Sequence, residues 1–254
     1  MCHPILLIFI ACSLQSFGQA NTKTYSNSTY QELKTRLWKI STSKEDLTTK
    51  RLRIFHSLAD IFTQYPADER NYSFLLDAIN LSLPQADSLT NLIDTSLSRS
   101  PFRGYALNIR KRITITETGK RFPELTLKDT LGKELAIDSL KGKVVLIDVW
   151  SSWCKPCRMQ IPGLVKLYKK YHEKGFEMIG VSLDKDKDSW LKAIAADKQS
   201  WPNYSELVDW NNNTFANRFF INAIPANYLI DKDGTILGID LSEEEIGRVL
   251  KNQL

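Results

Sequence analysis

The chain has 254 residues, of which 43% are hydrophobic and 25% are charged, and its formal net charge at pH 7 is +5. This composition is typical of a globular protein, and the length suits two domains. The mild basic excess is densest at Arg110-Lys111-Arg112. No basic stripe or aromatic platform accompanies this cluster, so it predicts a solvated helix end and no nucleic-acid partner.

Residues 1–20 have the pattern of a secretory signal peptide. The apolar run from Ile5 to Ala11 is too short to span a bilayer, and Gly18-Gln19-Ala20 has the small-x-small pattern of a signal-peptidase site. We therefore expect a periplasmic or otherwise extracytoplasmic mature protein. Membrane association is expected only if this segment is retained or if Cys12 is lipidated. Phe9 argues against lipidation, because such signals usually carry a small aliphatic residue there.

Residues 21–115 are predicted to form a helical N-terminal domain of four or five helices, because their apolar side chains recur at helical spacing. Ser82, followed by Pro84 and Gln85, has the pattern of a helix N-cap, and so has Ser100 before Pro101. The polar residues of this domain form no catalytic grouping. Packing or partner binding is its expected role.

Residues 116–254 alternate predicted strands and helices. Apart from Lys143 and Asp148, the run Lys143–Trp150 is apolar and rich in β-branched residues, which is typical of a central buried strand. The other predicted elements are extended segments at 124–127 and 134–137, a helix at 157–174, a strand at 176–183, a helix at 184–198, strands at 226–230 and 235–239 around an Asp233-Gly234 turn, and a helix at 243–254. This order predicts an α/β fold, a central sheet with helices on both faces.

The segment VWSSWCKPCRMQIPGL holds Cys154 and Cys157 at the first strand-to-helix junction. A structural disulfide here would close a loop of four residues, for which chain entropy predicts about 2 kcal/mol, against about 4.7 kcal/mol for 100 residues. A zinc site would need His56 and His172 to converge on both cysteines from separate elements. A dithiol that cycles between reduced and oxidised forms is therefore favoured. We expect no metal and no cofactor apart from a redox-active Cys154–Cys157 disulfide.

The segment from about Gly119 to Leu254 resembles the thioredoxin fold and, within it, the extracytoplasmic TlpA/ResA-like thiol-disulfide oxidoreductases. The resemblance rests on WSSWCKPC, on Pro162, on Ile224-Pro225 before a strand, and on the upstream FPELTLKDTLGKELAIDSLKGKVVLIDVW. It covers just over half the chain. It implies an enzyme that exchanges disulfides with protein substrates, most simply as a reductant, and that is served by an upstream redox partner.

The two cysteines are expected to differ in role. Only a thiolate attacks a disulfide, and Cys154 falls at a predicted helix N-terminus, where unpaired N–H groups and the helix dipole favour negative charge. Lys155 adds a cation, and Pro156 is tolerated in the first turn. Cys157 lies one turn deeper and should be less exposed. We therefore expect Cys154 to attack and Cys157 to resolve the mixed disulfide.

Asp148 is the third expected catalytic residue. A carboxyl group in a buried strand should have a raised pKa unless it is paired. In thioredoxins an aspartate at the matching place assists proton transfer with the second cysteine, and the resemblance implies this role for Asp148. The alternative is that the side chain caps a nearby backbone group.

The expected docking residues for a partner are Trp153, Pro156, Ile224 and Pro225. X-Pro bonds are cis in only about 5–6% of cases, but the resemblance implies a cis Ile224–Pro225 bond beside the cysteines. There it would present backbone groups to an added strand of the partner. The family usually has threonine after this proline, where this chain has Ala226. Trp150 could contribute to the same surface or belong to the core.

Two other functions remain open. A peroxiredoxin-like peroxidase shares the fold, but peroxidases usually place proline and threonine ahead of the reactive cysteine, and here Ser151 is the third residue before Cys154. The other is a partner-binding protein whose helical domain carries the function and whose redox centre is regulatory.

Overall fold

The structure is a computed structural model and describes residues 24–41, 43, 45–68, 70–74, 81–93, 102–128 and 134–254. The predicted signal peptide, with Cys12, and the predicted N-cap at Ser100 lie outside the described residues. The chain divides into two compact units, with the boundary between Thr114 and Ile115. Each unit is described by itself.

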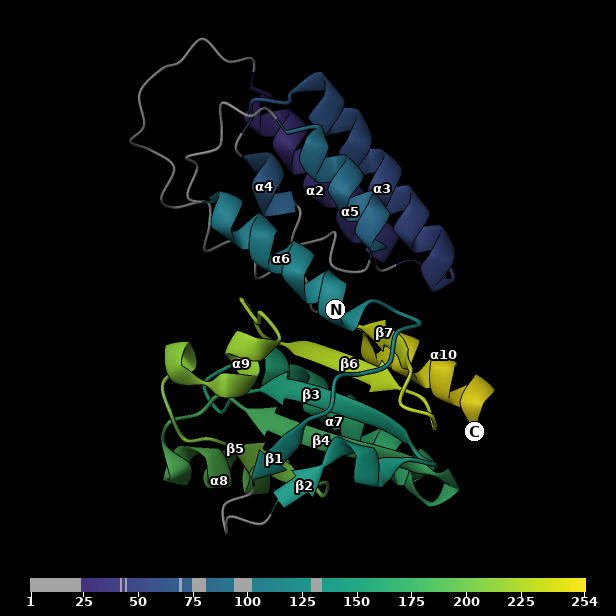
Figure 1. The fold of residues 1–254 in the computed structure, drawn as a ribbon, viewed down its shortest axis with the longest axis vertical. Coiled ribbons are helices and arrows are strands. Elements are labelled where there is room, and N and C mark those ends of the chain that lie inside the picture. The colour runs from purple at the N-terminus through teal and green to yellow at the C-terminus, as the bar shows by residue number, and fades with distance from the viewer. Residues whose placement is uncertain are drawn as a thin grey trace. The chain divides into compact units, whose positions relative to one another are not determined.

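The first unit is helical. Its described helices are α2 (Asn27–Ser41), α3 (Leu47–Gln64), α4 (Arg70–Phe74), α5 (Leu83–Asn91) and α6 (Phe102–Thr116) (Figure 1). On α2 the buried side chains are Tyr30, Leu33, Leu37 and Ile40, which recur at the spacing of one helix face. They belong to one apolar cluster with Leu58, Phe62 and Leu89 of α3 and α5. The apolar residues that recur at helical spacing in the sequence are therefore the ones that form the buried core of this unit.

Local signals set the starts of two helices. The predicted N-cap at Ser82 is confirmed, because Ser82 and Gln85 form a capping box at the start of α5. Asp46 caps α3 by accepting a hydrogen bond from the Thr49 N–H at 3.0 Å. Within the described ranges, no helix combines the length and the apolar character needed to cross a membrane.

The prediction of a solvated helix end at Arg110-Lys111-Arg112 is wrong for Arg112. This cluster lies inside α6, where Arg110 is exposed and bonds to Asp87 while Arg112 is buried. Residues two apart on an α-helix point about 200° away from each other. Two such arginines cannot both face solvent on a helix that packs against a bundle.

The second unit has a five-stranded sheet in the order β5-β4-β3-β6-β7. Its strands are β3 (Val144–Trp150), β4 (Phe176–Ser182), β5 (Asn203–Ser205), β6 (Ala226–Ile230) and β7 (Ile236–Ile239). Strands β3, β4 and β5 are parallel, whereas β6 and β7 are antiparallel to their neighbours. A separate antiparallel pair is formed by β1 (Thr126–Lys128) and β2 (Glu134–Ala136). Figure 1 shows β6, β3 and β4 side by side.

Helices flank this sheet, as the order of elements predicts. They are α7 (Lys155–Tyr171), α8 (Lys187–Ala196), α9 (Thr214–Arg218) and α10 (Glu243–Gln253), with 3₁₀ turns η4 (Ile137–Leu140), η5 (His172–Lys174) and η6 (Trp210–Asn212). Every residue of β3 and β4 is buried, which explains why both strands are mainly apolar, with Asp148 in β3 and Glu177 and Ser182 in β4 as the polar exceptions. The Asp233-Gly234 turn is confirmed, and Gly234 adopts a φ of 87° there.

Candidate active site

The two cysteines lie where β3 passes into α7. Cys154 is the N-cap of α7, its backbone is extended, and its Sγ accepts a hydrogen bond from the Cys157 N–H at 3.2 Å. Cys154 and Cys157 are joined by a disulfide. Pro156 stands in the first turn of α7, where the missing N–H has no intrahelical partner to lose. The predicted position of Cys154 at a helix N-terminus is therefore confirmed, although α7 begins at Lys155 and not at Cys157 as predicted.

The expected difference in exposure between the cysteines is small. Cys154 is 5% exposed and Cys157 is 3% exposed, so both are buried in this oxidised form. The disulfide bond accounts for the similarity, because it places each sulfur directly against the other. What distinguishes the two residues is their position on the helix: Cys154 caps it and Cys157 lies within it.

Asp148 is 4% exposed in the middle of β3. Burial raises the pKa of its carboxyl from 3.8 to about 7. Among the described residues this carboxyl makes no hydrogen bond and no ion pair, so the alternative of a backbone cap is not observed. Its neighbours in register are Gly180 on β4 and Asn227 on β6, and the Asn227 side chain bonds to the backbone of Leu241 instead. The burial of Asp148 and the direction of its pKa shift agree with the prediction.

The Ile224–Pro225 bond is cis, as the resemblance implies. Pro225 directly precedes β6, and Ala226, the first residue of β6, pairs with Val149 near the end of β3. Because β3 and β6 are antiparallel, this register places Pro225 at the carboxyl end of β3, the end from which the chain continues to the cysteines. Ile224 has a buried side chain, so only its backbone is suited to meet a partner.

The two predicted tryptophans have different positions. Trp150 is fully buried and its Nε1 donates to Asn203 Oδ1 at 3.0 Å, so it belongs to the core. Trp153 is 58% exposed next to Cys154, and its ring lies 6.0 Å from that of Trp210. Trp210 was not predicted from the sequence. An exposed aromatic surface therefore borders the disulfide.

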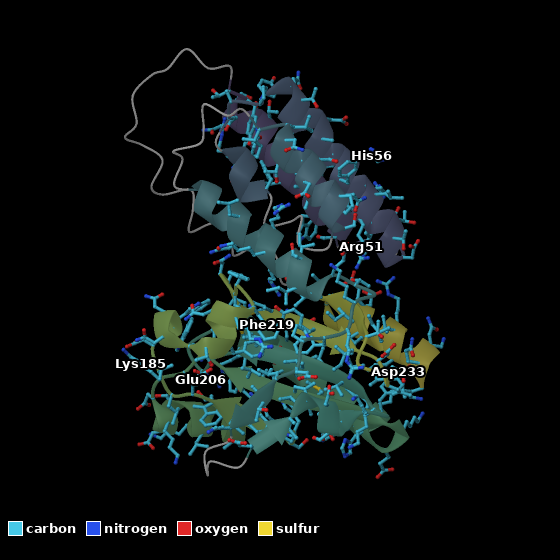
Figure 2. All side chains as sticks on the ribbon, in the orientation of Figure 1. Arg51, His56, Lys185, Glu206, Phe219 and Asp233 are labelled. Carbon is cyan, nitrogen blue, oxygen red and sulfur yellow. A yellow bond between two sulfur atoms is a disulfide. The ribbon has the colours of Figure 1, made fainter. Side chains whose placement is uncertain are left out.

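Trp210 is held in place by its own segment. Its Nε1 donates to the Ile221 carbonyl at 3.1 Å. Further along, the carboxylate of Glu206 accepts hydrogen bonds from the Thr214 N–H at 2.9 Å and the Phe215 N–H at 3.1 Å, at the start of α9. Figure 2 labels Glu206 together with Phe219, which follows α9.

Asp184 is a second carboxylate that sequence reasoning did not assign to the site. It lies two residues after the end of β4, is 2% exposed, and accepts hydrogen bonds from both the N–H and the hydroxyl of Ser152 at 2.8 and 2.6 Å. The sequence predicted a helix starting at Asp184. The helix α8 begins at Lys187 instead, because Asp186 is the residue that caps it through the Ser189 N–H at 2.8 Å.

A zinc centre finds no support in the part of the chain that the structure describes, where no group of three or more His, Cys, Asp or Glu side chains is placed to hold a metal. His172, one of the residues a zinc site would require, lies at the far end of α7. Its Nδ1 lies 3.2 Å from the Phe176 carbonyl, and its ring lies 4.5 Å from that of Tyr168.

A CxxC disulfide at a helix N-terminus, a buried aspartate in the preceding strand and a cis-proline at the same sheet edge define a thioredoxin-fold thiol-disulfide oxidoreductase. The comparisons with known proteins agree. Residues 118–239 match the AhpC/TSA family. The thiol-disulfide oxidoreductase ResA of Bacillus cereus strain ZK / E33L is 32% identical over 138 residues, which cover 54% of this chain and 75% of that protein. ResA of Bacillus anthracis is 33% identical over the same shares.

The chain therefore belongs to the ResA-type thiol-disulfide oxidoreductases of the thioredoxin-like family. A solved structure of the C-terminal domain of a protein assigned as a thiol-disulfide oxidoreductase from Bacteroides thetaiotaomicron is also similar. It has 34% identity and a TM-score of 0.50, and the match covers 54% of this chain and 96% of that domain. The AhpC/TSA match lies entirely within the second unit.

Proposed function

We propose that this protein is an exported reductant of protein disulfides, acting in the periplasm or another extracytoplasmic compartment. The observation that carries the proposal is the position of Cys154 as the N-cap of α7, with Cys157 in the following turn and the unpaired carboxyl of Asp148 in the preceding strand. Export is supported by the sequence pattern of residues 1–20.

The reaction begins with the reduced protein. The Cys154 thiolate attacks one sulfur of the partner's disulfide, forms a mixed disulfide and releases the partner's other sulfur as a thiolate. Cys157 then loses its proton and attacks Cys154, which restores the Cys154–Cys157 disulfide and releases the partner's second thiol. Two electrons pass to the partner, and an upstream redox partner must supply them again.

Asp148 serves the second step. A carboxyl group with a pKa near 7 exists in both protonation states at neutral pH, so it can accept the proton of Cys157 and release it afterwards. An ordinary aspartate would be too weak a base for a thiol, whose usual pKa is about 8.5. Burial in β3 therefore prepares Asp148 for this role.

The partner is proposed to dock on Trp153, Pro156 and the backbone of Ile224–Pro225. Trp153 offers an exposed apolar face beside the disulfide. The segment before β6 lies at the same sheet edge and can pair with an extended stretch of the partner's chain. Together these features suit a protein or peptide disulfide better than a small molecule.

Trapping experiments test the order of attack. Cys157→Ala should accumulate a mixed disulfide with the partner, because nothing remains to release it, whereas Cys154→Ala should trap little. Non-reducing gels, followed by identification of the trapped protein, give the order and the substrate together. Equal trapping by both variants would contradict the assigned roles.

The direction of electron flow needs a separate measurement. Titration of the Cys154/Cys157 couple against glutathione gives its potential. A potential of about −270 mV, in the thioredoxin range, supports a reductant, whereas a potential of about −120 mV indicates an oxidant.

A peroxidase is the second candidate, because peroxiredoxin-like peroxidases share the thioredoxin fold. Ser151 stands three residues before Cys154, and its hydroxyl is buried without a hydrogen bond among the described residues. It is therefore not arranged to bind a peroxide oxygen. Consumption of hydrogen peroxide by the reduced protein, coupled to oxidation of Cys154, would favour the peroxidase over the reductant.

A binding function of the helical unit is the third candidate. The whole formal charge of +5 lies in the first 114 residues, since residues 115–254 hold equal numbers of basic and acidic side chains. An acidic partner would therefore be attracted to the helical unit. Capture of the partner by a full-length Cys154→Ala/Cys157→Ala double variant would support this candidate, and its loss would exclude binding that is independent of the cysteines.

A further inference from the structure

Asp184 makes hydrogen bonds with both of its carboxylate oxygens. Oδ2 accepts from the Ser152 N–H at 2.8 Å and from the Ser182 hydroxyl at 2.7 Å, and Oδ1 accepts from the Ser152 hydroxyl at 2.6 Å. No cation pairs with Asp184 in the described part of the chain. A buried carboxylate is costly to desolvate, so these three donors must compensate for its burial.

These contacts join two strands at the site. The Leu183 N–H donates to the Trp150 carbonyl at 2.9 Å, which continues the pairing of β4 with β3 to the last residue of β3. Asp184 follows at once and reaches across to Ser152. The end of β4 is therefore fastened to the segment that leads from β3 to Cys154.

Ser152 lies in the middle of a tight turn. The Cys154 N–H donates to the Ser151 carbonyl at 3.2 Å, which closes the turn from Ser151 to Cys154. The next residue after Cys154 is the first of α7. The orientation of this turn therefore decides whether the sulfur of Cys154 meets the N–H groups at the helix start.

We propose that Asp184 is a positioning residue for the reductive reaction: by holding Ser152, it keeps Cys154 at the N-cap of α7 after the disulfide has opened. The inference rests on the proposed function, in which Cys154 is the attacking residue. In the oxidised protein the disulfide itself fixes Cys154. In the reduced protein that bond is gone, and the hydrogen bonds from Ser152 to Asp184 remain to hold the turn.

An asparagine at this position separates the hydrogen bonds from the charge. Its side-chain oxygen can take the place of Oδ2 and accept from the Ser152 N–H and the Ser182 hydroxyl. Its NH₂ group can take the place of Oδ1 and donate to the Ser152 oxygen, because a hydroxyl both donates and accepts. Asp184→Asn therefore keeps the hydrogen bonds to Ser152 and Ser182 but removes the negative charge, whereas Asp184→Ala removes both.

Asp186→Ala is the matched control. Asp186 is an exposed carboxylate two residues further on, and it caps α8 without touching Ser152. Its removal should cost a helix cap, about 1 kcal/mol, and leave the Ser151–Cys154 turn intact. It therefore reports what a loss of local stability does to the assay.

The experiment uses the reduced full-length protein in which Cys2→Ser and Cys12→Ser leave Cys154 and Cys157 as the two thiols of the chain, together with 5,5′-dithiobis(2-nitrobenzoate). The first thionitrobenzoate released reports attack by Cys154, and the second reports resolution by Cys157. For Asp184→Ala we expect the first release at pH 7 to be about tenfold slower, the size of effect that follows from losing hydrogen bonds to a charged group. The midpoint of its pH profile should rise. Asp184→Asn should stay within about threefold of wild type, and Asp186→Ala should match wild type.

Each other outcome is decisive. If Asp184→Asn and Asp184→Ala slow the first release equally, the effect is one of charge and the proposal is overturned. The proposal is also overturned if the first release in both variants is as fast as in wild type or faster. If Asp184→Ala does not fold, Ser152→Ala decides, with a loss of about threefold expected and a wild-type rate contradicting it. Cys154→Ala in the same assay separates this proposal from the proposed function, because a first release at the wild-type rate in that variant would show that Cys154 is not the attacking residue.

Discussion

Asp148 and Asp184 show how one site uses two buried carboxyl groups differently. Asp184 accepts three hydrogen bonds and is suited to hold a turn. Asp148 has no such partner among the described residues, and burial alone raises its pKa to about 7. The unpaired carboxyl is the one that can exchange protons at neutral pH, because no donor stabilises its ionised form.

The raised pKa of Asp148 makes the stability of the oxidised protein depend on pH. Since the folded-state pKa lies above the unfolded value of 3.8, the folded state binds more protons between pH 3.8 and about 7. Stability is therefore full below about pH 3.8, falls as the pH rises towards 7, and then levels off. Asp148→Asn removes this loss. We expect the variant to be more stable than wild type at pH 8, by up to about 4 kcal/mol at 1.36 kcal/mol per pKa unit, in urea unfolding.

Glu177→Gln is the matched control for that measurement. Burial opposes ionisation of Glu177, but hydrogen bonds from Tyr168, Lys143 and the Met178 N–H together lower its pKa. Its stabilising contribution is present above the unfolded pKa and is lost as the pH falls. Glu177→Gln should therefore destabilise the protein at pH 8, opposite in sign to Asp148→Asn. A destabilised Asp148→Asn at pH 8 would contradict the assignment of a costly buried charge.

Asp148→Asn should also slow the resolving step. The neutral amide cannot take the proton of Cys157, so the second thionitrobenzoate release should fall by roughly 10²-fold near pH 7, at the low end of general-base effects. The first release should be unchanged. In wild type the second release should rise through about pH 7 as the carboxyl ionises, and this inflection should be absent from the variant. Identical second-phase rates in both proteins from pH 6 to 9 would count against a proton-transfer role.

Among the helices and strands, the sequence best predicts those that are long or that carry a capping motif of their own. Strands β3 and β4 are seven-residue, mainly apolar runs, and α5 carries its capping box in its own sequence. Strand β5 and helix α9, of three and five residues, were missed. Strands β1 and β2 are as short as β5 but were predicted as extended segments, so length alone does not explain the miss. Strand β5 is defined by its pairing with β4 at Gly180 and Asn203. Such pairing is set by tertiary contacts and leaves no periodicity to read.

The same reasoning explains which site residues were found. Cys154, Cys157 and Asp148 share one strand-turn-helix segment, so a local motif contains them all. Asp184 and Trp210 come from later segments and reach the site only through the parallel pairing of β4 with β3 and through the contact with Trp153. In the sequence, Asp184 was predicted only as the first residue of the helix that follows β4, with no role at the site.

The segment from Glu206 to Ile221 should determine how firmly a partner is held. Glu206 accepts hydrogen bonds from the backbone at the start of α9. Trp210 lies in the chain between Glu206 and α9, and its ring contacts that of Trp153. Glu206→Ala removes the acceptor and should loosen Trp210. We expect the KM for reduction of insulin disulfides to rise about threefold, as for the loss of one hydrogen bond of about 0.5–1.5 kcal/mol, with an unchanged redox potential.

Ser242→Ala is the matched control for Glu206→Ala. It breaks the capping box at the start of α10, where Ser242 and Glu245 bond reciprocally, and should cost about 1 kcal/mol of stability without a change in KM. If both variants raise KM equally, the effect is one of general stability, and the 206–221 segment has no particular role in docking.

At the scale of the whole molecule, the two units differ in construction and charge. The helical unit has an apolar core of its own and carries the net positive charge. The second unit contains the sheet, the disulfide and the family match, and its charges balance. Each unit therefore has what an independently folding domain requires.

This construction predicts two separate unfolding transitions, and the tryptophans allow them to be told apart. Trp38 is the sole tryptophan in the first 114 residues, and the other five lie in the second unit. In Trp38→Phe, fluorescence therefore follows the second unit alone, while circular dichroism at 222 nm follows both. We expect the two signals to have different urea midpoints. Reduction should shift the unfolding of the second unit, which fluorescence reports alone, by no more than about 2 kcal/mol, because the disulfide closes a loop of four residues. The part of the circular dichroism change that belongs to the helical unit should stay where it is. The Cys154→Ala/Cys157→Ala variant should show no shift on reduction. Coincident transitions by both probes would mean that the chain unfolds as one cooperative body, and the assignment of two independent domains would then be wrong.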